Sequence, residues 1–495
     1  MANVLRAHGI SRSQSASAMR STNSGATTSL RSLSLENSDQ SGAISLESLD
    51  QWHDELEDDP KWKLAQTILS RVDFNFVLQN RATKIDDQMV FSHKVSMEGN
   101  PVANQLASGR CWLFALTNVV RVHTARKFNL DEFQLSQSYL FFYDHLSKAN
   151  WFLEQMIDLA DVSLEDETLR YILAQGPAQD GGQYDLAVAL VETFGLVPQT
   201  VYPESYNSSH SAELDTLLTS KLREFALDLR VRWSKARKTM GSSAAKAEAR
   251  ALKQDQMKVV FRILTIACGA PPKPDEEFTW EFNDKKGKYR SITTTPLEFA
   301  KIHAGYDVSQ AITLVNDPRH PWNTVLTVER LGNVVGGRTT RYLNVPIEVI
   351  KRSATELIRS NTPVWFVCDV DKSSMPMEGF MDLKIWNYDS AFGTQIKTTK
   401  EERIRLGDSM ITHAMMLTAV HLDSKTGKSV RWRVENSWGP KVANKGFLVM
   451  SDDWMSEYVF GIACPRSVLS ATLLDIYDHA EVVSLPPWDP LGAAA

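Results

Sequence analysis

Short apolar runs in the last third of the chain predict strands. Residues 361–370, NTPVWFVCDV, form a near-continuous apolar run suited to a buried strand. Residues 429–439, SVRWRVENSWG, alternate instead, and GFLVMS at 446–451 predicts a further strand. The positions of the alternating segment that share one face are Val430, Trp432, Val434 and Asn436.

Helical spacing dominates the earlier part. We expect ordered structure to begin near Ser45, in SLESLDQWHDELEDDPKWKLAQTILS. Between Pro198 and Pro271 the residue types favour helix, and Gly241-Ser242-Ser243 predicts a break. Helices followed by strands indicate an α+β protein with two lobes.

Composition narrows the class of protein. The chain has 495 residues, 43% of them hydrophobic, which is enough for a large core and more than one domain. Its net charge of -6 gives no overall attraction to nucleic acid or anionic lipid, and no apolar stretch is long enough to span a membrane. The four cysteines are far apart and form no C-x-x-C pair. We therefore predict no metal, no cofactor, no membrane partner and a reducing compartment, the cytoplasm.

The first 44 residues have a composition of their own. Arg6, Arg12, Arg20 and Arg31 stand among many serines and threonines, and no acidic residue precedes Glu36. This composition is typical of a mitochondrial transit peptide. A disordered serine-rich tail gives the same pattern, and both interpretations stay open.

Cys111 follows a Ser-Gly-Arg turn and precedes an apolar run, in NQLASGRCWLFALTNVVR. We expect Ser108 to cap a helix that opens at about Gly109 or Arg110, which places Cys111 in the first turn. The positive end of the helix dipole there lowers a thiol pKa and suits a nucleophile. A buried, inert cysteine is the alternative.

A base and its orienting group are predicted far downstream. His413 lies inside an apolar, strand-like run, THAMMLTAV, where its ring nitrogens need partners. Asn436, at the inward-facing end of its strand, can hold the imidazole without itself titrating, and Trp438 can shield that hydrogen bond. Gln105, on the loop before Cys111, can join the Cys111 backbone N–H in stabilising an oxyanion. Read singly, His413 is a satisfied core histidine and Gln105 an exposed loop residue.

Together these motifs resemble the papain-like cysteine peptidases, and within them the bleomycin hydrolase family of aminopeptidases. The pattern is Q-x5-C-W, a later strand histidine and then N-S-W-G, in the family's order Cys, His, Asn. Further segments of this chain that resemble the bleomycin hydrolase family are FSHKVSMEGNPVANQ, AQDGGQYDLAVALVETFGLVP, VNDPRHPWN, VVGGR and the terminal PPWDPLGAAA.

The resemblance implies an architecture and roles. It implies a papain-like two-lobe fold with a large helical insertion and a C-terminal arm in the cleft. The expected divisions are an extension at 1–44, a helical lobe at 45–204, a basic helical insertion at 205–300, a β-rich lobe at 301–484 and the arm at 485–495. The residues implied for the site are Cys111, His413 and Asn436 for catalysis, Gln105 for the oxyanion, and Gly181, Gly182, Trp438 and Ala495 for substrate binding.

The resemblance also implies an activity and partners. It implies an aminopeptidase for peptides with a free N-terminus, with bleomycin and homocysteine thiolactone among its substrates, in a homohexameric ring. The terminal carboxylate of the arm, at Ala495, is expected to receive the substrate's amino group.

Two departures from the secreted papains have physical explanations. Ser108 stands where their C-G-[SA]-C-[WY] signature has a structural cysteine, which fits a reducing compartment. The interval from Cys111 to His413 is about 300 residues against roughly 130–150 in papain-type enzymes, and the helical insertion accommodates the excess.

Three other functions stay open. One is a nucleic-acid-binding ring that uses the basic insertion, although a solvated helix face explains those charges equally well. The others are a thiol acyltransferase built on the same residues and a papain-type endopeptidase. The basic residues in question are Arg230, Arg232, Lys235, Arg237, Lys238, Lys246 and Arg250.

Overall fold

The computed structural model describes residues 42–493, which fall into two compact units. The first unit comprises the chain up to Ala82 together with Lys384–Lys397, and the second comprises Thr83–Leu383 and Thr398 to the end. Residues 1–41, with the proposed targeting extension, and Ala494 and Ala495 lie outside the described part.

The first unit is built from short helices. Ser45 caps the first of them by accepting a hydrogen bond from the Ser48 N–H, so ordered structure begins where the sequence predicted. Backbone hydrogen bonds within the unit join Asn80 to Ile385 and Asn387 to Leu78. Its helices are α2 (Leu46–Asp58), α3 (Pro60–Leu69), α4 (Phe74–Val77) and α14 (Tyr388–Phe392), and α5 (Arg81–Asp86) begins at its boundary.

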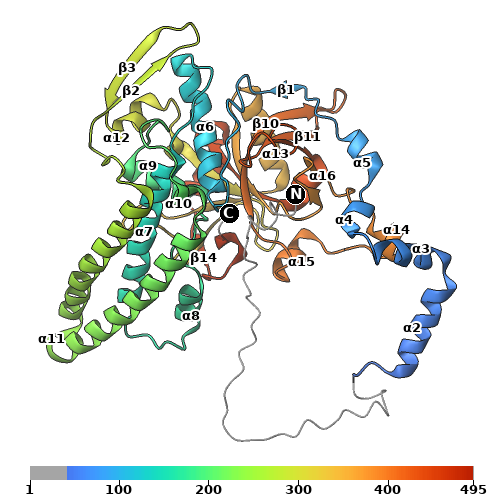
Figure 1. The fold of residues 1–495 in the computed structure, drawn as a ribbon, viewed down its shortest axis with the longest axis horizontal. Coiled ribbons are helices and arrows are strands. Elements are labelled where there is room, and N and C mark those ends of the chain that lie inside the picture. The colour runs from blue at the N-terminus through green and yellow to red at the C-terminus, as the bar shows by residue number, and fades with distance from the viewer. Residues whose placement is uncertain (1–41, 494–495) are drawn as a thin grey trace, which may run out of the picture. The chain divides into compact units, whose positions relative to one another are not determined.

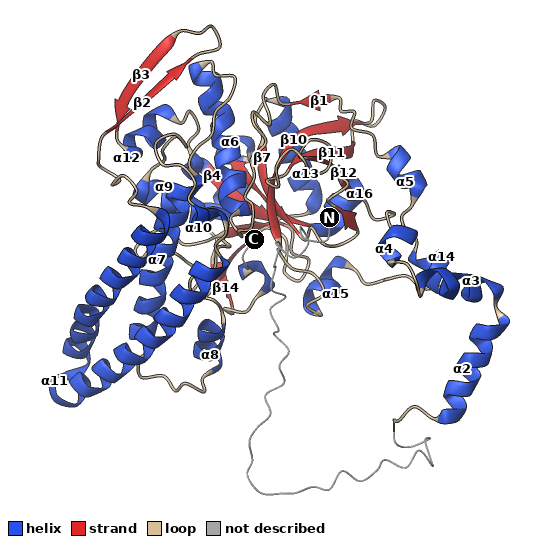
Figure 2. Cartoon of the chain, viewed as in Figure 1, coloured by secondary structure: helices blue, strands red, loops and turns tan. Residues whose placement is uncertain are grey.

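A mixed sheet organises the second unit (Figure 2). Its strands follow the order β14-β5-β6-β4-β13-β7-β10-β11-β12-β9-β8, and β1 pairs with β10. They are β1 (His93–Lys94), β4 (Ala311–Val315), β5 (Thr324–Val328), β6 (Tyr342–Asn344), β7 (Val364–Cys368), β8 (Ser374–Met375), β9 (Phe380–Met381), β10 (His413–Leu422), β11 (Ser429–Glu435), β12 (Phe447–Ser451), β13 (Val459–Pro465) and β14 (Val482–Leu485).

Helices surround this sheet. They are α6 (Cys111–Phe128), α7 (Gln137–Asp158), α8 (Glu167–Ala174), α9 (Tyr184–Phe194), α10 (Tyr206–Ser209), α11 (Ala212–Cys268), α12 (Pro296–Glu298), α13 (Ile347–Arg359), α15 (Lys400–Arg405), α16 (Asp452–Tyr458) and α17 (Ala471–His479). None of the helices in residues 42–493 combines the length and apolar character that a membrane span requires.

Both faces of the central strands are buried. On β7, Trp365 and Val367 join the core formed with α6, α7, α9 and α11, whereas Val364 and Phe366 join a second core beneath α13 and α16. A strand covered on both faces needs apolar residues at successive positions rather than at alternate ones. This explains the near-continuous apolar run of 361–370 and confirms the predicted strand.

The long helical segment is a hairpin of two arms. Gly241 has φ 77° and ψ 173° inside α11, so the chain turns where the sequence predicted a break. The arms pack against α7 (Figure 1). Beyond α11 the structure departs from the expected helical insertion, because β2 (Phe278–Asn283) and β3 (Tyr289–Thr294) form a separate antiparallel hairpin. The predicted α+β class is confirmed.

One predicted face needs correction. Trp432 and Val434 are buried, but Val430 is 40% exposed because the core that covers the other two does not reach the start of β11. Glu435, on the face of β11 opposite Trp432 and Val434, is buried and pairs with Arg121 of α6 at 2.5 Å. This partner compensates its buried charge.

Candidate active site

Cys111 is the first residue of α6 and is buried. The predicted Ser108 cap is wrong: the N-cap position is Arg110, without a side-chain cap bond. Ser108 Oγ instead donates to the Gln105 carbonyl at 2.7 Å and accepts from Arg110 Nε at 2.9 Å. The cysteine therefore has the expected place in the helix by a different loop geometry.

The Cys111 thiol is neutral in this closed structure. Burial raises its pKa to about 12, against an opposing hydrogen bond from the Ala414 backbone. From the sequence, the helix dipole was expected to lower the pKa of the Cys111 thiol, but desolvation has the larger effect here. The thiol thus needs a nearby base, and contact with Ala414 places it beside the residue that follows His413.

His413 and Asn436 meet at one edge of the sheet. His413 opens β10 and Asn436 directly follows β11, its antiparallel neighbour. His413 Nε2 lies 2.9 Å from Asn436 Oδ1, and both side chains are buried. The Ser437 N–H donates to the same Oδ1 at 2.7 Å, which turns the amide oxygen toward the ring.

The N-S-W-G segment runs alongside the loop before Cys111. The Gln105 N–H donates to the Ser437 carbonyl at 2.8 Å, and Ser437 Oγ donates to Gln105 Oε1 at 2.6 Å. Gln105 Nε2 donates one hydrogen to the Ser108 carbonyl at 2.6 Å. Gln105 is buried, not exposed, and its orientation is fixed at both ends of the amide.

Trp438 lies beside the histidine as expected. Its ring centroid is 5.0 Å from that of His413. Gly439 has φ +81°, and a Cβ there would lie 2.9 Å from Asn104 Nδ2. Only glycine allows the N-S-W-G segment to approach the nucleophile loop this closely.

Gly181 and Gly182 lie over Trp112, the residue after the nucleophile. A Cβ on Gly182 would sit 2.7 Å from the Trp112 indole, and Trp112 Nε1 donates to the Asp180 carbonyl at 2.7 Å. We call residues 179–183 the 179–183 strip. Through Gly182 it packs against Trp112 in the first turn of α6, one residue after Cys111.

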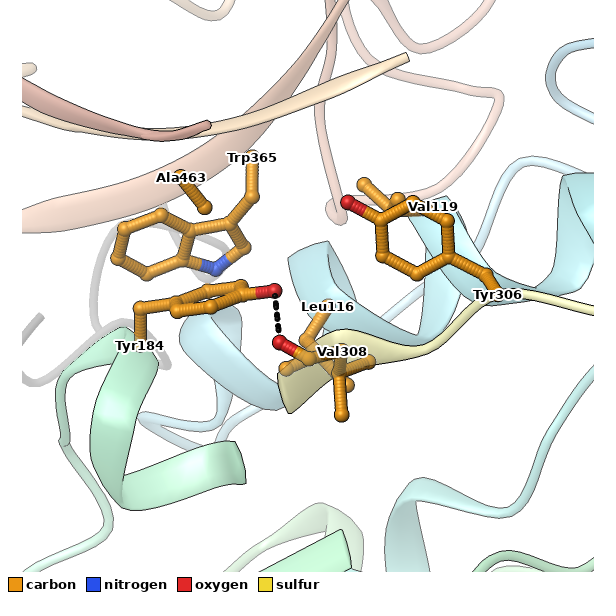
Figure 3. Close-up of a pocket in the computed structure, with 7 residues that line it drawn as sticks. All are labelled: Leu116, Val119, Tyr184, Tyr306, Val308, Trp365 and Ala463. Carbon is orange, nitrogen blue, oxygen red and sulfur yellow. Dashed lines mark hydrogen bonds between the residues drawn. The ribbon is translucent and has the colours of Figure 1, made fainter. Parts of the chain in front are cut away.

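A packed layer supports the site from within (Figure 3). Trp365 Nε1 donates to the Trp112 carbonyl at 3.2 Å, and the Trp365 and Tyr184 rings are 5.2 Å apart. Figure 3 shows the Tyr184 hydroxyl donating to the Val308 carbonyl, at 3.1 Å. The gap among these side chains has no room for a water molecule, so it is core and not a ligand cavity.

The C-terminal arm, residues 485–495, reaches the 179–183 strip. Gln183 Nε2 donates to the Ala493 carbonyl, and the Tyr342 hydroxyl donates to the Leu491 carbonyl at 3.2 Å. Leu491 is buried. Ala495, the predicted substrate-binding terminus, lies outside the described residues, only two positions further on.

A buried ionic group behind the strip escaped the sequence analysis. His145 Nε2 lies 2.9 Å from Asp215 Oδ1 and 3.6 Å from Asp180 Oδ1. Burial alone lowers the pKa of His145, but the nearby carboxylates, Asp215 foremost, raise it overall. The sequence signal was the group Asp144, His145 and Lys148, with 144 and 148 one helical turn apart, the spacing of an ion pair on one helix face.

Comparisons with known proteins identify the family. The Peptidase C1-like family matches residues 43–492. Human bleomycin hydrolase is 40% identical over 448 residues, covering 89% of this chain and 96% of that protein. Cysteine proteinase 1, mitochondrial, of Saccharomyces cerevisiae is 38% identical over 460 residues, covering 92% and 94%.

A solved structure is similar over almost the same length. PepW from Lactobacillus rhamnosis has a TM-score of 0.86 and 37% identity, and the match covers 92% of this chain and all of that one. The fold is therefore papain-like, as the sequence indicated. This chain belongs to the Peptidase C1-like family and is a cysteine-type peptidase.

Proposed function

We propose that this peptidase is an aminopeptidase that uses a Cys-His-Asn triad. The observation that carries the proposal is the docked arm: its Ala493 is held by Gln183, at the end of the strip that packs on Trp112 beside Cys111. An arm that occupies one side of a cleft leaves room for a chain end there and excludes a continuous polypeptide.

The chemistry follows from the contacts. Cys111 Sγ attacks the scissile carbonyl while His413 Nδ1 accepts the thiol proton and passes it to the leaving amine. Asn436 Oδ1 accepts from Nε2–H and keeps the ring oriented. The free hydrogen of Gln105 Nε2 and the Cys111 N–H stabilise the oxyanion. Water then hydrolyses the thioester.

Charge at the end of the arm sets the preference for free amines. A carboxylate in a partly buried cleft attracts an α-ammonium strongly and has nothing to bind in an acetylated substrate. Trp438, beside His413, shields the reacting groups from water.

The substrate class follows from the same recognition. Peptides with a free N-terminus fit, and so do homocysteine thiolactone, a thioester with a free amine, and bleomycin, the compound for which the human relative is named. The test compares one aminoacyl fluorogenic amide in its free and N-acetylated forms. Equal kcat/KM for the two forms would refute the aminopeptidase proposal.

A second copy of this chain is the proposed partner, in a hexamer. In α2, α3 and α4 no residue is buried, and apolar side chains such as Trp52, Leu56 and Phe76 are exposed. Apolar helices left uncovered favour association. Light scattering of the intact protein at micromolar concentration should give six times the 55.6 kDa chain mass, and a monomer would contradict this.

Nucleic-acid binding stays a prediction that receives little support. Arg230 donates to the Leu159 and Val162 carbonyls of the α7 end. Four more of the basic residues pair with acids of this chain: Arg232 with Glu248, Arg237 with Asp161, Lys246 with Asp158 and Arg250 with Glu154. Charges already paired attract phosphate less. DNA retention that falls steeply between 50 and 200 mM salt would revive the alternative.

A location is proposed from the extension and from a relative. The yeast relative is named as mitochondrial, and residues 1–44 have transit-peptide composition. We place the chain in the cytoplasm and, through this extension, in mitochondria. Residues 1–44 fused to a fluorescent protein should direct it to mitochondria, and a wholly diffuse signal would contradict that address.

A further inference from the structure

The 179–183 strip is held by one buried lysine. Lys148, on α7, donates to the carbonyls of Gln179 at 2.8 Å and Gly181 at 2.7 Å. Its ammonium also pairs with Asp144 at 2.6 Å and lies 5.2 Å from the centre of the Trp112 ring. The lysine is only 9% exposed, so a side chain without donors would leave these carbonyls unpaired in the interior.

Asp180 ties the same strip to the turn before the nucleophile. Its Oδ2 accepts from the Gly109 N–H at 2.6 Å and from Ser211 Oγ at 2.5 Å, and its Oδ1 lies 3.6 Å from His145 Nε2. Gly109 lies two positions before Cys111. The structural cysteine of the secreted papains is absent from this turn, where Ser108 bonds only to its own loop and Arg110. The Asp180 carboxylate therefore bonds the strip to the turn before Cys111, and the Lys148 ammonium bonds it to α7.

The other end of the strip holds the arm. Gln183 donates to the Ala493 carbonyl. The backbone carbonyls of residues 179 to 181 accept hydrogen bonds from Lys148 and Trp112. The distance from Cys111 to Ala493 thus depends on the five residues of the 179–183 strip, which is bonded to the nucleophile turn through Asp180 and to the arm through Gln183. When the Lys148 hydrogen bonds are lost, the 179–183 strip can shift, and the arm then moves relative to the Cys111 thiol.

We propose that Lys148 and Asp180 are positioning residues that fix the register between Cys111 and the arm, and so determine how many residues are released from a substrate. This inference rests on the proposed aminopeptidase function. Neither residue contacts the reacting atoms; each acts through the strip.

The first test compares Lys148→Met with Lys253→Met. Lys253 is an equally buried lysine that pairs with Glu154 and Asn150 between α11 and α7, away from Cys111, and it serves as the matched control. Mass spectrometry of a pentapeptide digest gives the position of the first cut, and iodoacetamide measures the reactivity of Cys111.

We expect Lys148→Met to lower kcat/KM for a free-amine aminoacyl amide at least tenfold and to produce first cuts beyond residue one. The rate of Cys111 alkylation should change less than threefold, because iodoacetamide reacts with the thiol without using the 179–183 strip. The control should keep single-residue release. Unchanged cut position and kcat/KM in folded Lys148→Met would overturn the inference, as would the same losses in Lys253→Met.

Asp180→Asn keeps the test decisive if Lys148→Met does not fold. The Asp180 charge contributes to the raised pKa of Cys111, so this variant should shift the pH midpoint of alkylation downward and also blur the cut position. Neither effect follows from a purely structural role, and absence of both would overturn the inference. Wild-type protein indifferent to acetylation would instead refute the proposed function.

Discussion

An ion pair between the arm and the body of the unit permits a quantitative prediction. Arg319 Nη2 lies 2.7 Å from Asp317 Oδ2 and 2.8 Å from Asp489 Oδ1. Asp317 belongs to the body of the unit, and Asp489 belongs to the arm. All three side chains are at most 10% exposed, so water and salt screen the pair weakly. Asp489→Asn removes the charge that Arg319 binds and keeps an acceptor for the Leu491 N–H, which Asp489 now caps.

The magnitude follows from the strength of a charge-assisted bond. Coulomb attraction at 2.8 Å is about 6 kcal/mol at an effective dielectric constant of about 20, but desolvation leaves roughly 1.5–3 kcal/mol net. The asparagine oxygen still accepts from Arg319 with roughly half that strength. The expected loss is therefore about 1.4 kcal/mol, or a tenfold rise in the population with the arm displaced.

The assay measures that population through blocked substrates. Only protein with a displaced arm can accept an N-acetylated peptide, so its kcat/KM should rise about tenfold in Asp489→Asn while turnover of the free-amine form changes little. Asp452→Asn, which weakens the Lys351–Asp452 pair away from the arm, is the matched control. An unchanged ratio of acetylated to free-amine turnover in Asp489→Asn would refute the reasoning.

The remaining predictions address the thiol, its base and a buried lysine. Cys111→Ala should abolish hydrolysis of an aminoacyl fluorogenic amide while the circular dichroism spectrum stays unchanged. Full activity in this variant would refute the mechanism. Asn436→Ala should lower kcat by roughly 10²–10³-fold with a smaller effect on KM, because the His413 ring loses its orienting bond. Burial lowers the pKa of Lys400 from 10.5 to about 7, so between these pH values the unfolded chain binds more protons and stability rises with pH. The Tm of wild type minus that of Lys400→Met should therefore increase from pH 7 to 10, and a flat difference would contradict the burial argument.

The sequence predicted the strands and the site's principal residues for identifiable reasons. The apolar run at 361–370 and the break at Gly241 are local signals, and each was confirmed. His413 and Asn436 were inferred from the cost of burying polar groups in an apolar strand, and the structure brings them within 2.9 Å. Their catalytic roles stay predictions.

What the sequence could not predict depends on contacts between distant segments. Ser108 was an acceptable cap by residue type, but its hydroxyl donates to the Gln105 carbonyl instead, and the N-cap position is Arg110, two residues later. Glu435 lies on the face of its strand opposite Trp432 and Val434, yet it is buried and pairs with Arg121, 314 residues away. No local pattern distinguishes a buried, paired charge from an exposed one, because the partner decides its burial.

The proposed register has a consequence for how the chain's segments depend on one another. The nucleophile turn, the 179–183 strip and the arm are far apart in sequence, but each is bonded to the next through Asp180 and Gln183. Arg319 holds the arm from the opposite side. A change in the arm therefore alters the substrate register only while the 179–183 strip stays in place. Lys148 holds the strip there. The specificity of the site thus depends as much on a lysine of α7 as on the terminal residues themselves.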